Sequence, residues 1–234
     1  MKSIIINIDF DFYSDSNGKD PDYASPTLKT YHQKLWSKKL PNGKIFDLES
    51  GRKNTYLYHY SELGEFYLGS DAITHSYKTH TRKKWLTNQI PDHVNQLYSK
   101  GSTIGGYLIF PNNRINGKHT INQARGVNAK IDDRFDLTLE CIKRFYNGIS
   151  SPLYETLGRY EYYFKLFEDF ENFTDYFLLN DLIDEKKEIK FYLPFDEFQS
   201  KPKFHDISDY LFYKNSVIEF INKRNHRIKL FSVE

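Results

Sequence analysis

The first half of the chain alternates short runs of β-branched and aromatic residues with turn residues, a pattern typical of β-strands. Residues 4–8 form the first run and predict a strand, and residues 9–22 follow it as an acidic loop. The other runs predict strands at residues 44–48, 56–60, 65–68 and 103–110. Helices are predicted at residues 26–36 and 91–100, each with a proline at the first position, where its fixed φ suits a helix.

Apolar residues in the second half recur every three or four positions, which indicates helices with one face toward a core. Thr120 is expected to cap the first of these helices. The residues of its predicted inward face are Ile121, Ala124 and Val127. The next helix is expected to begin near residues 132–133, because carboxylates interact favourably with the N-terminal end of the helix dipole. Further helices are predicted from residue 152, at residues 173–183 and at residues 208–224, with a strand at residues 189–193.

These patterns predict an α+β fold, with a strand-rich N-terminal half packed with a helix-rich C-terminal half, in one domain spanning residues 1–234. The chain contains 19 Tyr and 19 Phe, so large rings are expected to fill the core. Cys141 is the only cysteine and lies in a helical apolar stripe, which excludes a disulfide within the chain and argues against a thiol nucleophile. No apolar run is long enough to span a bilayer or to act as a signal peptide. We therefore expect a cytoplasmic protein without membrane association.

One polar segment, residues 105–136, departs from the even charge balance of 33 Lys plus Arg against 31 Asp plus Glu. Amide, guanidinium, ammonium and imidazole groups crowd it, and no carboxylate appears before Asp132. A loop between a strand and a helix is a geometry in which amides and basic side chains bind phosphate or carboxylate. The residues predicted to bind such an anion are Asn112, Asn113, Arg114, Lys118, Asn122 and Arg125. His119 is the predicted general acid or base, because the pKa of histidine lies near neutral pH.

A structural role explains the same residues without a ligand. Asparagines in this segment are common turn residues. Its basic groups would then pair with Asp132, Asp133 and Asp136. The segment contains neither the glycine-lysine loop of P-loop proteins nor the dinucleotide glycine fingerprint. Both interpretations remain open at this point.

Two other segments carry candidate chemistry. Asp9 and Asp11 follow the first predicted strand on one face, where they would hold Mg²⁺ or simply form an exposed acidic turn. Basic residues at 78–84 precede Trp85, which suits either single-stranded nucleic acid or a solvated segment anchored by the ring. The histidines lack the spacing of a zinc site, so no metal ligand is predicted among them.

Two blocks of sequence, residues 62–91 and 101–146, carry a resemblance to a known family. They resemble an uncharacterised bacterial protein family, a domain of unknown function from bacterial and prophage-like contexts. The resemblance extends from the SDSNGKDPD loop at residues 14–22 to FYLPFDEF at residues 191–198. It implies an intracellular bacterial protein and assigns neither an activity nor a catalytic residue.

The leading functional hypothesis is an intracellular protein that binds or acts on a nucleotide or nucleic-acid phosphate through residues 112–125. One alternative is a non-catalytic module whose partner is another protein, for example in a phage–host conflict. A second alternative is Mg²⁺-dependent phosphoryl chemistry at Asp9 and Asp11. The sequence leaves the cofactor, the oligomeric state and the question of catalysis open.

Overall fold

Four antiparallel strands form one sheet in the order β1–β2–β3–β4. The computed structural model describes residues 5–73 and 83–232. The strands are β1 (Glu49–Ser50), β2 (Leu57–Ser61), β3 (Gly64–Ala72) and β4 (Tyr107–Pro111). The register places His59 opposite Phe66 and Ser70 opposite Ile109. Although β4 forms one edge of the sheet, it is buried along its whole length because other elements cover it.

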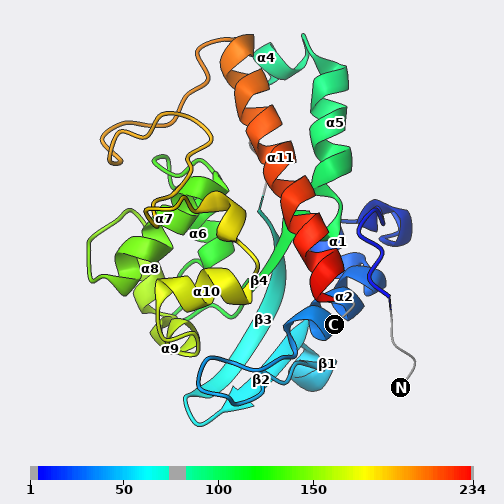
Figure 1. The fold of residues 1–234 in the computed structure, drawn as a ribbon, viewed down its shortest axis with the longest axis vertical. Helices are drawn as coiled ribbons and strands as arrows, with labels where there is room; N and C mark the ends of the chain where they lie inside the picture. Colours follow the sequence, from blue (N-terminus) through cyan, green and yellow to red (C-terminus); the bar gives the residue numbers. More distant parts are fainter. Residues whose placement is uncertain (1–4, 74–82, 233–234) are drawn as a thin grey trace.

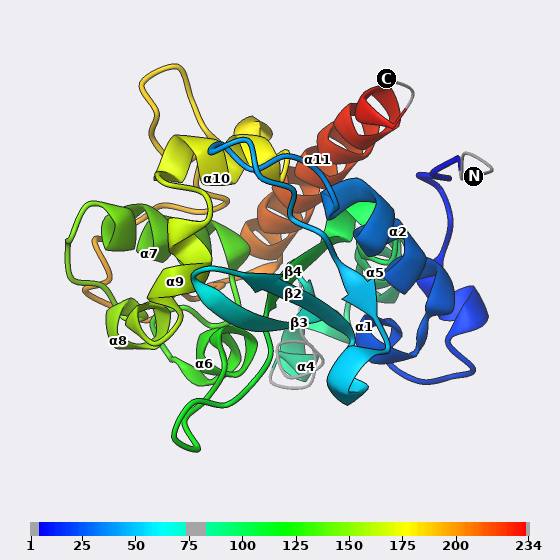
Figure 2. The same ribbon diagram turned by 90° about the horizontal axis from the view of Figure 1, so that it is seen from below.

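Helices lie on both sides of this sheet (Figures 1 and 2). They are α1 (Pro21–Ala24), α2 (Pro26–Trp36), α4 (Lys84–Thr87), α5 (Pro91–Gly101), α6 (Ile121–Val127), α7 (Phe135–Tyr146), α8 (Tyr154–Gly158), α9 (Glu161–Lys165), α10 (Phe170–Tyr176) and α11 (Ile207–Phe231). Short 3-10 turns are η1 (Phe12–Asp15), η2 (Arg52–Asn54), η3 (Ile104–Gly106) and η4 (Asn180–Leu182). Helices α6 to α10 gather on one side of the sheet, α1 and α2 lie on the other, and α11 packs against α5 and η3. The predicted α+β class is confirmed, with the sheet in the N-terminal half.

The predicted strand at residues 4–8 is wrong for its described part, because residues 5–8 adopt no strand. Their backbone groups have other partners. The N–H of Asn7 donates to the Tyr31 hydroxyl at 3.0 Å, and the N–H of Phe10 donates to the Asn7 carbonyl at 3.2 Å. A strand needs the hydrogen-bond ladder of a neighbour. Asp9 and Asp11 therefore follow a turn and not a strand.

Several other predicted elements change. In place of strands at residues 44–48 and 189–193 there are two isolated bridges, Lys39–Ile45 and Ile183–Ile189. The helix predicted from residue 152 is divided into α8 and α9. In place of the helix predicted at residues 173–183, the shorter α10 begins earlier in the chain and ends at Tyr176. Leu178 has a left-handed φ of 56°, which a right-handed helix does not accommodate, so α10 ends before it.

Aromatic rings fill much of the core, and some of the tyrosine hydroxyl groups donate to backbone carbonyls there. Tyr163 donates to the Ile109 carbonyl at 2.9 Å, and Tyr176 donates to the Trp36 carbonyl at 2.5 Å. Burial raises the pKa of the Cys141 thiol to about 12, so little thiolate forms at neutral pH. Within residues 5–73 and 83–232, none of the helices has the length and apolar character needed to cross a membrane.

Candidate functional site

A cavity of about 380 Å³ lies where α1, the end of β3 and α6 meet. Its side chains include four aspartates, three tyrosines and two amides: Asp20, Asp22, Asp71, Asp133, Tyr13, Tyr98, Tyr107, Asn122 and Gln123. We call this cavity the carboxylate pocket. Its volume falls in the range typical of small-molecule sites.

Arg125 of α6 lies behind the wall of the carboxylate pocket and holds two of its carboxylates. The side chain is fully buried. Its Nη1 donates to Asp71 Oδ2 at 2.8 Å, and its Nη2 lies 3.6 Å from Asp133 Oδ1. The guanidinium also donates to the carbonyls of Ala72 and Asp133, each at 3.0 Å, and to Thr138 Oγ1 at 3.2 Å. Every nitrogen of this side chain therefore has a partner inside the protein.

A strained turn positions Asp133. Asp132 and Asp133 have left-handed φ angles of 47° and 62°, which residues other than glycine rarely adopt. The N–H of Asp132 donates to the Asn128 carbonyl at 2.9 Å, and the N–H of Asp133 donates to the Arg125 carbonyl at 3.1 Å. Lys83 Nζ lies 2.5 Å from Asp132 Oδ2. Because of this turn, α7 begins at Phe135 and not near residue 132 as predicted.

A directed chain of hydrogen bonds runs from the core to Asp22. Trp36 Nε1, which can only donate, donates to His32 Nδ1 at 3.1 Å. Burial lowers the pKa of His32 to about 3, so the ring is neutral and its one proton is on Nε2. That nitrogen lies 3.0 Å from Ser70 Oγ and donates to it, and Ser70 donates to Asp22 Oδ1 at 3.0 Å. The chain thereby fixes the orientation of the Asp22 carboxyl group.

Two carboxyl groups of the pocket differ in pKa. Asp22 keeps some exposed area because it faces the cavity, but the surrounding protein desolvates its carboxyl group. This desolvation, with the nearby charge of Asp71, raises the pKa of Asp22 to about 8. Burial likewise raises the pKa of Asp71 to about 6, although Arg125 opposes the shift. The pKa of Asp22 therefore lies above that of Asp71, a separation of the kind found between acid and base carboxyl groups.

The structure separates the residues that were predicted to bind an anion. Arg125 is enclosed by its aspartates, while Asn122 lines the carboxylate pocket. At the start of α6, Arg114 Nε and His119 Nδ1 lie 3.1 and 3.4 Å from Gln123 Oε1. These four predicted residues therefore divide between the protein interior, the pocket and the surface.

The other three predicted residues lie outside the carboxylate pocket. The N–H of Asn112 donates to the Tyr67 carbonyl at 2.7 Å, and the carbonyl of Asn113 accepts the Tyr160 hydroxyl at 2.8 Å. Lys118 is exposed. The seven predicted residues do not converge on one hollow, so anion binding by this set, with His119 as its acid or base, stays a prediction.

The alternative at Asp9 and Asp11 gains no support from the geometry. Asp11 Oδ1 accepts the N–H of Tyr13 at 3.0 Å and caps η1, and Asp9 is exposed. In the part of the chain that the structure describes, no three histidine, cysteine, aspartate or glutamate residues lie close enough to hold a metal ion. Most of the predicted basic run, residues 78–82, lies outside the described residues.

The sequence analysis did not single out Asp22 and Asp71, which line the carboxylate pocket. The signal for Asp71 was present, because a carboxylate in the apolar strand 66–72 is unusual and needs a buried partner. Nothing near Asp22 distinguishes it from the other acidic residues of its loop.

Residues 6–228 match the family of unknown function DUF6994. No curated protein and no solved structure matches the chain. The matched range includes every residue of the carboxylate pocket. It covers nearly the whole chain, so this protein belongs to the family of unknown function DUF6994.

Proposed function

We propose that this protein is an acid–base hydrolase that cleaves a glycosidic bond of an uncharged, hydroxyl-rich substrate in the carboxylate pocket. One observation carries the proposal: Asp22 and Asp71 line the same cavity, and Arg125 pairs with Asp71, which favours the ionised form of Asp71 while burial favours the protonated form of Asp22. Glycoside hydrolysis generally uses two carboxyl groups in these two states, one as proton donor and one as base or nucleophile.

The lining of the pocket supports this class of substrate. Its described side chains include four carboxyl groups and no lysine or arginine, so a phosphate or another anion would be repelled. Carboxylates accept hydrogen bonds from hydroxyl groups, and the amide of Asn122 both donates and accepts them. Tyr13 and Tyr98, the two tyrosines of the lining that keep exposed area, add apolar ring surface for a sugar.

The proposed reaction consumes one water molecule. As the glycosidic C–O bond breaks, Asp22 donates its proton to the leaving oxygen. Asp71 takes a proton from water, and the water oxygen forms the new bond to the sugar carbon. Proton exchange with solvent then returns both groups to their starting states. Arg125 positions Asp71, and Ser70 with the N–H of Ala72, at 3.3 Å from Oδ2, positions Asp22.

Asp22→Asn is expected to slow hydrolysis of alkyl glycosides by about 10²–10⁴-fold, the usual contribution of a general acid. The loss should be far smaller for nitrophenyl glycosides, because nitrophenolate leaves without a proton. The wild-type rate should follow a bell-shaped pH profile with limbs near the pKa values of about 6 for Asp71 and about 8 for Asp22. The alkaline limb should be absent in Asp22→Asn. A panel of alkyl and nitrophenyl glycosides, assayed across this pH range, measures these differences.

Asp9→Asn is the matched control, because it makes the same chemical change at an exposed aspartate outside the pocket. It should keep the wild-type rate and pH profile. The proposal is wrong if the wild type hydrolyses no glycoside in the panel. Equal losses of Asp22→Asn on both classes of leaving group would rule out the acid role.

A further inference from the structure

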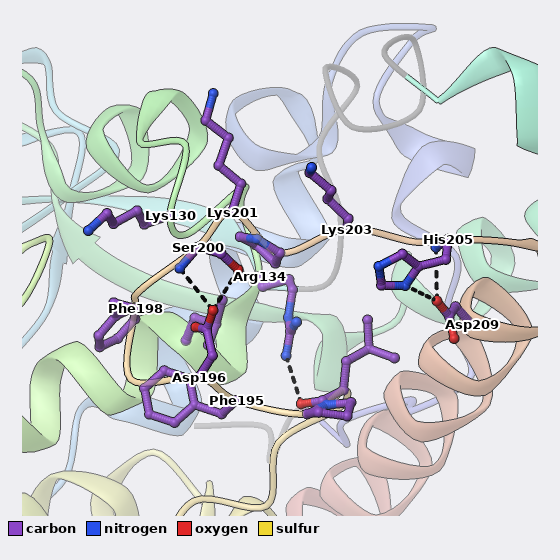
Figure 3. A pocket seen from close by; sticks show the side chains of 14 residues that line it. Lys130, Arg134, Phe195, Asp196, Phe198, Ser200, Lys201, Lys203, His205 and Asp209 are labelled. Carbon is purple, nitrogen blue, oxygen red and sulfur yellow. Dashed lines mark hydrogen bonds and ion pairs between the residues drawn. The ribbon is translucent and has the colours of Figure 1, made fainter.

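A second cavity, of about 460 Å³, lies between the start of α7 and the loop of residues 194–206 (Figure 3). Its basic side chains are Lys130, Arg134, Lys201, Lys203 and His205. We call this cavity the basic hollow. Asp133 lines the carboxylate pocket, and the next residue, Arg134, lines the basic hollow. Two cavities of opposite charge therefore share one short segment of chain.

The two carboxylates of the basic hollow are held by neighbours on their own segments. Asp196 accepts the N–H of Ser200 at 2.8 Å and its hydroxyl at 2.5 Å. Asp209 accepts the N–H of His205 at 2.8 Å and lies 2.9 Å from its Nδ1. Figure 3 shows Lys201 extending away from both carboxylates. Among the described residues, neither aspartate forms an ion pair with a lysine of the hollow.

Three lysines of the hollow have no counter-ion among the residues that the structure describes. Lys130, Lys201 and Lys203 are exposed, and no described carboxylate forms an ion pair with any of them. Arg134 differs, because its guanidinium pairs with the buried Asp136. Like charges around one cavity repel each other, and a bound anion would relieve this repulsion.

Apart from Ser200, the rest of the lining is apolar, and it includes two phenylalanine rings. Phe195 stacks on Phe191 with ring centroids 4.3 Å apart and lies edge-on to Phe198 at 4.8 Å. Phe198 is buried. It follows Glu197 in a turn, and both residues have left-handed φ angles, 59° for Glu197 and 61° for Phe198. This packing gives the hollow a fixed aromatic floor beside its lysines, which suits a ligand with both a flat ring and an anionic group.

We propose that the basic hollow binds a phosphorylated small molecule with a flat ring, of the nucleoside monophosphate class. Lys130, Lys201 and Lys203 bind the phosphate, and the ring lies against Phe195, which packs on Phe198. In this proposal, Lys130 is the residue of the polar segment that contacts the phosphate, and residues 112–125 do not contact it. This site is independent of the proposed hydrolase activity.

Calorimetric titration of the full chain with AMP, adenosine and inorganic phosphate tests the site. The wild type should bind AMP more tightly than either part, and added salt should weaken binding because it screens the lysines. The double substitution Lys201→Met with Lys203→Met should weaken AMP binding at least tenfold. Arg114→Met with Lys118→Met is the matched control, since it also removes two exposed cations, and it should bind AMP like the wild type. Thermal unfolding of both variants verifies that they fold.

Each other outcome overturns the proposal or part of it. If the wild type does not bind AMP, the proposal of a binding site in the basic hollow is wrong. If the Arg114 and Lys118 variant binds AMP more weakly and the Lys201 and Lys203 variant binds it like the wild type, the phosphate is bound by residues 112–125 and not by the basic hollow. Equal affinity for phosphate and AMP contradicts the role of the aromatic floor.

Discussion

Replacement of Arg125 by methionine is expected to lower the free energy of unfolding by about 3–5 kcal/mol, because it leaves buried carboxylates without their counter-ion. Asp71 and Asp133 are only 3% and 5% exposed, so solvation from the pocket compensates for only a small part of the lost guanidinium. The carbonyls of Ala72 and Asp133 lose a donor in the same substitution. Methionine keeps an unbranched chain in place, so the loss reports mainly on charge and hydrogen bonding. Denaturant unfolding of the two proteins measures it.

The loss at Arg125 should grow with pH. Without the guanidinium, the folded-state pKa of Asp71 rises further above its unfolded value. A carboxyl group of this kind stabilises the fold at low pH, and the contribution disappears as pH rises through the folded-state pKa. The deficit should therefore be larger at pH 8 than at pH 5.

Two further variants separate charge from packing at Arg125. Adding Asp71→Asn to Arg125→Met should recover part of the stability, because it removes one unpaired carboxylate. Arg114→Met changes an exposed arginine near the same helix, and its effect should stay within about 0.5 kcal/mol. A loss below about 1 kcal/mol for Arg125→Met at pH 8 would contradict the claim that Arg125 holds the pocket carboxylates in place.

The second large loss is expected for Arg224→Met in α11. Arg224 is fully buried and donates to the carbonyls of Gly105 at 2.9 Å, Tyr107 at 2.7 Å and Phe177 at 3.1 Å. In the described chain no carboxylate pairs with it, and burial lowers its pKa to about 9. Methionine removes the buried charge but takes a donor from three carbonyls, at about 1–3 kcal/mol for each one left unsatisfied. We expect a net loss of about 3 kcal/mol, measured by denaturant unfolding.

Arg227→Met provides the control for Arg224, because it makes the same change one helical turn further along α11. Arg227 is partly exposed and bonds to Asp181 at the surface, so its replacement should cost less than about 1 kcal/mol. Equal effects at the two positions would mean that Arg224 does not join α11 to the sheet and to the segment after α10.

Helices that depend on local signals were predicted well. The expected helices at residues 26–36 and 91–100 correspond to α2 and α5, and Thr120 caps α6 in a capping box with Gln123. The strand expected at residues 4–8 does not form over its described part, residues 5–8, and the reason is non-local. Its residues favour extended backbone, but only the folded chain determines whether another strand lies beside them.

Arg125 shows how far the candidate site could be predicted. Ile121, Ala124 and Arg125 are buried at positions i, i+3 and i+4, whereas Val127, which was expected to face inward, is 45% exposed. Helical spacing alone could therefore have placed this arginine inside. Its partner Asp71 lies 54 positions away, and a single sequence does not indicate which distant residues meet.

The protonation state of Asp22 at neutral pH is the central claim, and a carboxyl ¹³C titration by NMR measures it directly. The resonance that disappears in Asp22→Asn identifies the group. We predict that it titrates near pH 8, with Asp71 near pH 6. An Asp22 carboxyl that is fully ionised at pH 6, with a pKa near the ordinary value of about 4, would contradict the account.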